Sequence, residues 1–278
     1  MPLQRAMASR KRFKISNCIG KPVTPSQPIP RASDVLTGVS WHKPPRDVID
    51  KLGVASQWLM GVDIETNDWV TSPGNKGSIG RFGFYNLCAP VDFEARIVQI
   101  GWAFGPPGET TTLKEYVVCP TDFNISEKAT KYHNISHEHA RQNGKPARDV
   151  LTEFMSDLNH VIQIRHGRLV CHHLEFDAGI IMKELLRCDM QHDARMFDPI
   201  VRMGLCTMDP GIGRWLTQCS GEDQGASQTM NVLKLRTVVE LILPEKTQLL
   251  DRIHNAGVDA LLHRDVAYAL IGLSDTAC

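Results

Sequence analysis

The hydrophobic pattern of this chain predicts clustered strands first and then strands that alternate with helices. Apolar runs of strand length are expected at residues 57–64, 96–104, 113–119 and 168–172, with a brief fifth run at 195–197. Helical spacing of apolar residues is expected over 126–158, with a break at 144–146, and over 177–186, 230–243 and 258–270, with a short helical stretch after 197. This order predicts an α/β protein whose mixed five-stranded sheet is flanked by helices, antiparallel at first and parallel later.

The first 45 residues differ in composition from the rest. They contain a series of prolines among polar residues, namely Pro22, Pro25, Pro28, Pro30, Pro44 and Pro45. Residues 1–33 carry seven basic side chains and no acidic one, although the whole chain has a formal net charge of zero. We therefore expect a disordered, basic and proline-rich leader over residues 1–45 and one folded domain over residues 46–278. An organelle-import signal is the alternative that this composition leaves open.

Several classes of protein are excluded by composition. No run approaches the ~20 apolar residues that a membrane-spanning helix needs, and no secretory signal pattern begins the chain. None of the eight cysteines is spaced as C-x-x-C, so a zinc finger has no support. We expect an intracellular protein with reduced thiols, in the cytoplasm or the nucleus and not in a membrane.

Two acids, Asp63 and Glu65, stand at the end of the first predicted strand. Side chains two residues apart on a strand point to the same face, so the two carboxylates lie side by side. Adjacent carboxylates resist ionising together, and burying them is costly unless a cation neutralises them. Hard ions such as Mg²⁺ prefer such oxygen ligands. A solvated strand end is the alternative, and the second copy of the pattern at residues 92–94 reads as a polar loop.

Three further residues are candidates for the same site. Asp177 is expected to open a helix after the fourth long strand, where capping of that helix is the alternative role. His254 and Asp259 are five residues apart and would not share a face of one helix. They converge if His254 lies on a loop and Asp259 in the first turn of the helix that follows. His133 and two neighbouring histidines, at 137 and 139, are interpreted as a solvated helix face and not as a metal site.

The order and setting of these motifs resemble the DEDDh family of 3′→5′ exonucleases, which have an RNase H-like fold. Residues 62–66 (Val-Asp-Ile-Glu-Thr) are similar to its first motif, 170–177 to its second and 254–259 to its third. Residues 97–101 (Ile-Val-Gln-Ile-Gly) and 134–138 are similar as well. The resemblance covers about residues 55–272 and implies an RNase H-like sheet. His173, where many members have Asn, and the long segment at roughly 67–95 depart from the family pattern.

The resemblance implies a metal-dependent nuclease. Asp63, Glu65, Asp177 and Asp259 would hold two divalent cations, Mg²⁺ or Mn²⁺, about 4 Å apart, and His254 would be the general base. The partner would be a nucleic acid with a free 3′ end, from which 5′-mononucleotides are released. A non-catalytic nucleic-acid-binding module and an RNase H-like endonuclease are the alternatives. The sequence does not distinguish DNA from RNA or single from double strands as the substrate, and it does not indicate the oligomeric state.

Substrate contacts are expected around the end of the first strand. Thr66 closes the first motif, and an insertion at 74–85 follows it. In that insertion, Lys76 and Arg81 are candidates for phosphate contacts, and Phe82 and Phe84 for stacking on bases. The alternative is a hairpin whose aromatic side chains pack on the body of the protein.

Overall fold

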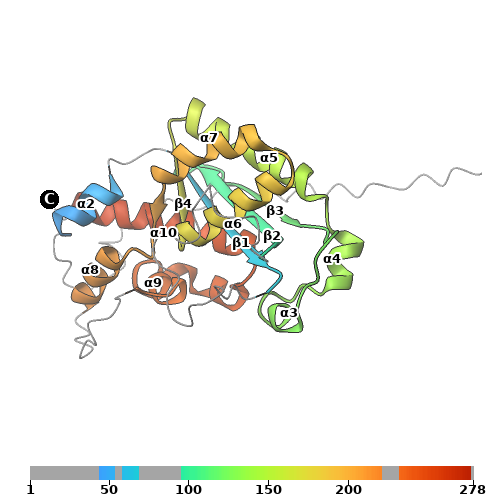
Figure 1. Ribbon diagram of the computed structural model, residues 1–278. Coiled ribbons are helices and arrows are strands. Elements are labelled where there is room, and N and C mark those ends of the chain that lie inside the picture. The colour runs from blue at the N-terminus through green and yellow to red at the C-terminus, as the bar shows by residue number, and fades with distance from the viewer. Residues whose placement is uncertain (1–43, 54–57, 69–94, 221–231, 277–278) are drawn as a thin grey trace, which may run out of the picture.

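The computed structural model describes residues 44–53, 58–68, 95–220 and 232–276. Nearly all of the expected leader lies outside these residues, so the division into a leader over 1–45 and a domain over 46–278 stays a prediction. In the described part of the chain, five strands form one sheet in the order β3-β2-β1-β4-β5 (Figure 1). The strands are β1 Leu59–Thr66, β2 Ile97–Gly105, β3 Thr112–Val117, β4 Arg168–Cys171 and β5 Leu205–Cys206.

The sheet is mixed in the way that the sequence predicts. Strands β1, β2 and β3 pair antiparallel as a meander, whereas β4 runs parallel to β1 and β5 runs parallel to β4. Strand β1 therefore lies at the centre of the sheet, between an antiparallel and a parallel neighbour. The carboxyl ends of β1 and β4 point the same way, which brings the residues that follow the two strands to one edge.

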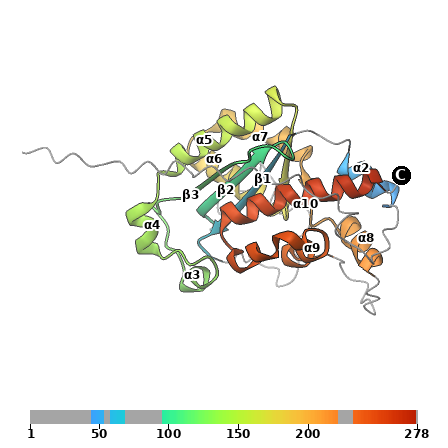
Figure 2. The same ribbon diagram turned by 180° about the vertical axis from the view of Figure 1, so that it is seen from behind.

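Helices cover both faces of the sheet (Figure 1, Figure 2). Helices α5, α6 and α7 pack on one face, and α10, backed by α9, packs on the other. Their bounds are α5 Ala147–Asn159, α6 Leu174–Arg187, α7 Gln191–Arg202, α9 Leu235–Ile242 and α10 Ala256–Thr276. The remaining elements are α2 Arg46–Leu52, α3 Glu127–His133, α4 His137–Asn143, a π-helical turn His160–Ile164, α8 Pro210–Ser220 and a 3-10 helix Pro244–Arg252. Within the described residues, no helix is both long and apolar enough to cross a membrane.

The brief strand expected at 195–197 is wrong, because those residues lie inside α7. The buried side chains of this helix are Ala194, Phe197, Ile200 and Val201, whose spacing of three and four residues is helical. A run of three residues is too short for its period to separate strand from helix. The fifth strand is instead the two-residue β5, eight residues further along the chain.

The helical region expected over 126–158 is divided twice and not once. The break at 144–146 is confirmed, since α4 ends at Asn143 and α5 begins at Ala147. A second break lies at Asn134, which adopts a left-handed conformation at the end of α3. Ser136 then begins α4 by accepting a hydrogen bond from the backbone N–H of His139.

Helix α10 approaches the sheet unusually closely, at two glycines of β1 and β2. A Cβ atom at Gly61 would lie 2.0 Å from the carbonyl oxygen of Ala260, and one at Gly101 would lie 2.3 Å from that of Ala256. Both neighbours are backbone atoms, which cannot turn aside as a flexible side chain can. Glycine at these positions lets the first turns of α10 rest directly on the strands. The contact fixes where residues of that first turn lie relative to the end of β1.

Candidate active site

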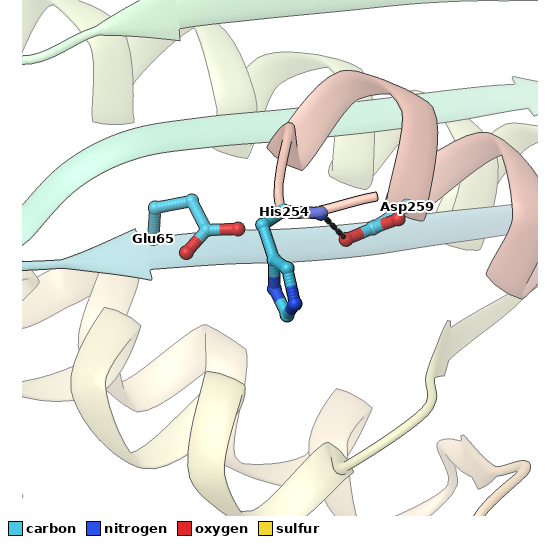
Figure 3. A group of neighbouring side chains, drawn as sticks. All are labelled: Glu65, His254 and Asp259. Atoms are coloured by element: carbon cyan, nitrogen blue, oxygen red, sulfur yellow. Dashed lines mark hydrogen bonds between the residues drawn. The ribbon is translucent and has the colours of Figure 1, made fainter. Parts of the chain in front are cut away.

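Glu65, His254 and Asp259, which belong to distant parts of the chain, meet at the end of β1 (Figure 3). One ligand atom from each lies within 4.8 Å of those of the other two. Glu65 comes from the end of β1, Asp259 from the first turn of α10, and His254 from the loop just before that helix. In Figure 3 the imidazole of His254 lies between the two carboxylates.

The loop before α10 adopts the arrangement that the sequence predicts for His254 and Asp259. His254 has a left-handed backbone, with φ of 67°, and its N–H donates a hydrogen bond of 2.8 Å to Asp259 Oδ2. The side chain of Asn255 accepts a hydrogen bond from the N–H of Val258 (3.0 Å) and so caps the helix. These bonds turn His254 back over the helix terminus and hold it beside Asp259.

Buried Gln99, from β2, ties the start of α10 to the sheet. Its Oε1 accepts a hydrogen bond of 2.9 Å from the N–H of Ala256, and its Nε2 donates one of 2.7 Å to Glu115 Oε1. Gln99 lies opposite Glu65 in the pairing of β1 with β2. The sequence pattern marks residues 97–101 only as similar to the family, and it does not reveal this anchoring role.

Asp63 and Asp177 adjoin the group of three. Asp63 lies two residues before Glu65 on β1 and faces α10, as Gly61 does. Asp177 is buried in the first turn of α6, which begins three residues earlier than expected. Burial raises the pKa of Asp63 well above its usual range, and the charges of Asp177, Asp259 and Glu65 raise it further. The structure therefore gathers all four predicted acids in one electrostatic neighbourhood.

The pKa values of the other three acids are raised as well. Burial raises the pKa of Asp177 well above its usual range, helped by the charges of Glu65 and Asp259. Burial also raises the pKa of Glu65 to about 8, together with the charge of Asp259, and raises that of Asp259 to about 7. Carboxylates placed this closely resist ionising together, and a cation among them removes the cost.

The residues present fit a divalent cation. The donor set is made of carboxylate oxygens, which Mg²⁺ and Mn²⁺ accept readily. Among the described residues, Asp259 Oδ1 is buried and has no hydrogen-bond partner, although its other oxygen is bonded to the loop. A buried oxygen without a partner is costly unless something binds it. A divalent cation held by Asp259 and Glu65 would supply that partner.

His254 is exposed and next to an aromatic side chain. The ring of Tyr132, which is 46% exposed, meets the imidazole edge to face at 5.8 Å between ring centres. Partial burial and the positive charge of Arg236 lower the pKa of His254. A neutral imidazole is the form that accepts a proton, so both influences favour a basic role. The sequence gives no signal for Tyr132, because it lies in the last turn of a short polar helix.

The interpretation of the other histidines as a solvated face is wrong for His133. This side chain is 6% exposed, and its Nδ1 accepts a hydrogen bond of 3.1 Å from the N–H of Ile135. The left-handed turn at Asn134 folds the chain back over His133 and buries it. His139 is exposed, as expected.

Of the residues predicted to contact substrate, only Thr66 lies in the part of the chain that the structure describes. Its Oγ1 donates a hydrogen bond of 3.0 Å to the carbonyl oxygen of Asp68, at the end of β1 next to Glu65. Lys76, Arg81, Phe82 and Phe84 lie outside the described residues, so their roles stay predictions.

No protein-family model matches the sequence, and no curated protein matches it either. Solved structures do match. E. coli exonuclease I in complex with a dT13 oligonucleotide superposes with a TM-score of 0.51 and 13% identity, over 77% of this chain and 40% of that one. Product-bound exonuclease I gives 0.50 and 11%, over 80% of this chain and 46% of that one. The chain has the fold of these exonucleases.

The match is to part of a larger protein, since this chain spans less than half the length of exonuclease I. The nuclease domain of 3′hExo, a DEDDh family member bound to rAMP, aligns over 80% of this chain and 94% of its own with 11% identity and a TM-score of 0.47. The RNase H-like α/β class expected from the motifs is confirmed by the sheet and by the match to exonuclease I. At sequence identities this low, the similarity establishes a shared fold and nothing further.

Proposed function

We propose that this protein is a metal-dependent 3′→5′ exonuclease of the DEDDh type, which releases 5′-mononucleotides from a free 3′ end. The observation that carries the proposal is the meeting of Glu65, His254 and Asp259, with Asp63 and Asp177 within electrostatic range, on a fold shared with exonuclease I. Four acids brought together from three distant segments, with raised pKa values, are costly to the fold. Proteins keep such a destabilising group of acids where it serves a function, and a catalytic metal centre is one such function.

In this proposal, Asp63, Glu65, Asp177 and Asp259 hold two divalent cations, Mg²⁺ or Mn²⁺. When bound, the cations neutralise the phosphoryl group and lower the pKa of the attacking water. His254 accepts the proton of that water, a role for which its exposure and lowered pKa suit it. Its backbone bond to Asp259 keeps the base and a metal ligand in fixed relation. Tyr132 offers an exposed ring beside the base, on which a nucleobase can stack.

The decisive experiment is digestion of 5′-labelled oligonucleotides, single- and double-stranded, of DNA and of RNA, with Mg²⁺ or with EDTA. We expect stepwise shortening from the 3′ end that requires the metal and is abolished by Asp63→Asn. The matched control is Asp47→Asn, which makes the same substitution at an exposed acid of α2, outside the group of four acids. Shortening that survives Asp63→Asn at the original rate refutes the assignment.

A circular substrate separates the alternatives. An exonuclease leaves a single-stranded circle intact, whereas an RNase H-like endonuclease cuts it. Tight oligonucleotide binding with no cleavage in Mg²⁺, Mn²⁺ or Co²⁺ would instead identify a binding module on the same fold.

A further inference from the structure

A buried histidine that the proposed mechanism leaves unused faces Asp63 from helix α10. His263 lies four residues after Asp259, so the two side chains leave the same face of the helix, one turn apart. Its side chain is 2% exposed, and its Nε2 lies 3.7 Å from Asp63 Oδ1. In the sequence His263 is one of several polar residues in the last helix, and no motif marks it as part of the site.

The protonation of His263 follows from its other nitrogen. Nδ1 lies 2.8 Å from the carbonyl oxygen of Val62. A carbonyl oxygen only accepts hydrogen bonds, so the ring proton is on Nδ1 and Nε2 presents a lone pair. A neutral ring with its proton on Nδ1 forms no salt bridge with Asp63.

A hydrogen bond does not account for the contact either. The separation of 3.7 Å between Nε2 and Oδ1 exceeds hydrogen-bond range, so the two atoms are not bonded to each other directly. Nε2 and Oδ1 are both possible metal-ligand atoms, and they lie 3.7 Å apart. Two ligand atoms that are each about 2.1 Å from one ion stand at most ~4.2 Å apart, so a single cation can accept both.

We propose that His263 Nε2 is a further ligand of the cation that Asp63 holds, which gives this carboxylate centre one nitrogen donor. The inference rests on the proposed metal-dependent function. Metal-ligating histidines usually donate their other ring N–H to a carboxylate or a backbone carbonyl, as His263 does to Val62. Imidazole suits the later transition metals, whereas oxygen ligands suit Mg²⁺. The added nitrogen therefore favours ions such as Co²⁺ over Mg²⁺.

His172 provides a matched control. Its ring stacks on that of His263 at 5.9 Å between ring centres, and it is 8% exposed. However, its Nδ1 and Nε2 are engaged with Thr207 Oγ1 at 2.9 Å and with the carbonyl oxygen of Leu233 at 3.0 Å. Replacing either histidine by alanine removes the same volume from the same stack, but only one replacement removes a nitrogen that faces a carboxylate.

The test measures Co²⁺ and Mg²⁺ binding to the full chain by calorimetry, without nucleic acid. We expect His263→Ala to weaken Co²⁺ binding about 10- to 100-fold and Mg²⁺ binding by no more than about threefold. His172→Ala is expected to leave the ratio of the two affinities unchanged. An equal loss for both ions, or the same change of ratio in His172→Ala, would show that His263 only packs.

A spectroscopic measurement keeps the inference open to refutation if His263→Ala does not fold. Pulsed EPR of the Mn²⁺-loaded protein reports a directly bound ¹⁴N, which we expect to persist in His254→Ala and to vanish in His263→Gln. Absence of a bound ¹⁴N in the unaltered protein overturns the inference. Cleavage without a ¹⁴N signal refutes the ligand role alone, whereas a ¹⁴N signal without cleavage refutes the exonuclease alone.

Discussion

The close approach of α10 to the sheet predicts that Gly101→Ala impairs activity through the position of Asp259. The new Cβ would lie 2.3 Å from the carbonyl carbon and oxygen of Ala256 and 2.4 Å from the backbone nitrogen of Gly257, where ordinary contacts are 3.4–4 Å. The start of α10 must therefore move away from β2 by about 1 Å. Asp259 and His254 move with it, while Glu65 stays on β1.

The size of the effect can be estimated from this displacement. Overpacking by one methyl group usually costs about 1–3 kcal/mol in the free energy of unfolding. For a domain of this size each kcal/mol lowers the melting temperature by about 2–4 °C, so we expect a fall of roughly 2–12 °C. A misplacement of about 1 Å in a catalytic group costs on the order of 100-fold in rate. We therefore expect kcat on a short oligonucleotide to fall about 100-fold at a temperature where the variant is fully folded.

The control is Gly272, a glycine of α10 itself. A Cβ atom at Gly272 would meet no heavy atom within 4 Å, so Gly272→Ala is expected to keep full activity and to gain about 0.5–1 kcal/mol from helix propensity. The assay compares thermal melts and single-turnover cleavage of both variants. Unchanged cleavage by a folded Gly101→Ala protein would refute the claim that this contact positions Asp259.

Three other predictions concern the charges and the ring around the site. In metal-free protein, Glu65 and Asp259 keep their protons up to a pH of about 8 and about 7, respectively. In the unfolded chain, the same two groups lose their protons near their ordinary pKa values of 4.5 and 3.8. The free energy of unfolding therefore falls as pH rises from about 5 to 8. The measurement is the melting temperature in EDTA over this pH range. A melting temperature that does not fall, or that Mg²⁺ does not restore, contradicts the prediction. Arg236→Ala removes a charge that lowers the pKa of His254, so the acidic limb of the pH–rate profile is expected to move to higher pH, whereas Arg236→Lys leaves it in place; an unmoved limb argues against His254 as the base. Tyr132→Ala is expected to weaken oligonucleotide binding by about 1–3 kcal/mol of lost stacking and Tyr132→Phe to leave it unchanged, and equal affinities in a fluorescence titration would place the substrate elsewhere.

The parts of the fold that the sequence predicts are those with long, regular patterns. Strands β1 and β2 are nearly continuous apolar runs because both of their faces are covered by helices. Strand β5 has two residues, and no period can be seen in so short a run. The extra break at Asn134 depends on a left-handed residue that the pattern of apolar positions does not record.

The candidate site divides in the same way. Asp63 and Glu65 are visible in the sequence because acids are unusual at the end of a buried strand, and His254 with Asp259 is visible only when a loop is assumed before the last helix. Gln99 and His263 are not visible as parts of the site. Their positions are set by the approach of α10 to the sheet, which is a property of tertiary packing and not of the local sequence.

The packing that hides these two residues also explains how an unstable group of acids is kept in place. Four carboxylates that repel one another would separate if they stood on mobile loops. Here Asp63 and Glu65 stand on the central strand, and Asp259 stands on a helix that two glycines bring against that strand and that Gln99 ties to β2. Burial and mutual repulsion therefore appear as raised pKa values of Asp63 and Asp177 instead of as movement. A cation that entered would meet ligands already in position, so it would release protons without having to fold the site, and its binding energy would add to the stability of the whole domain.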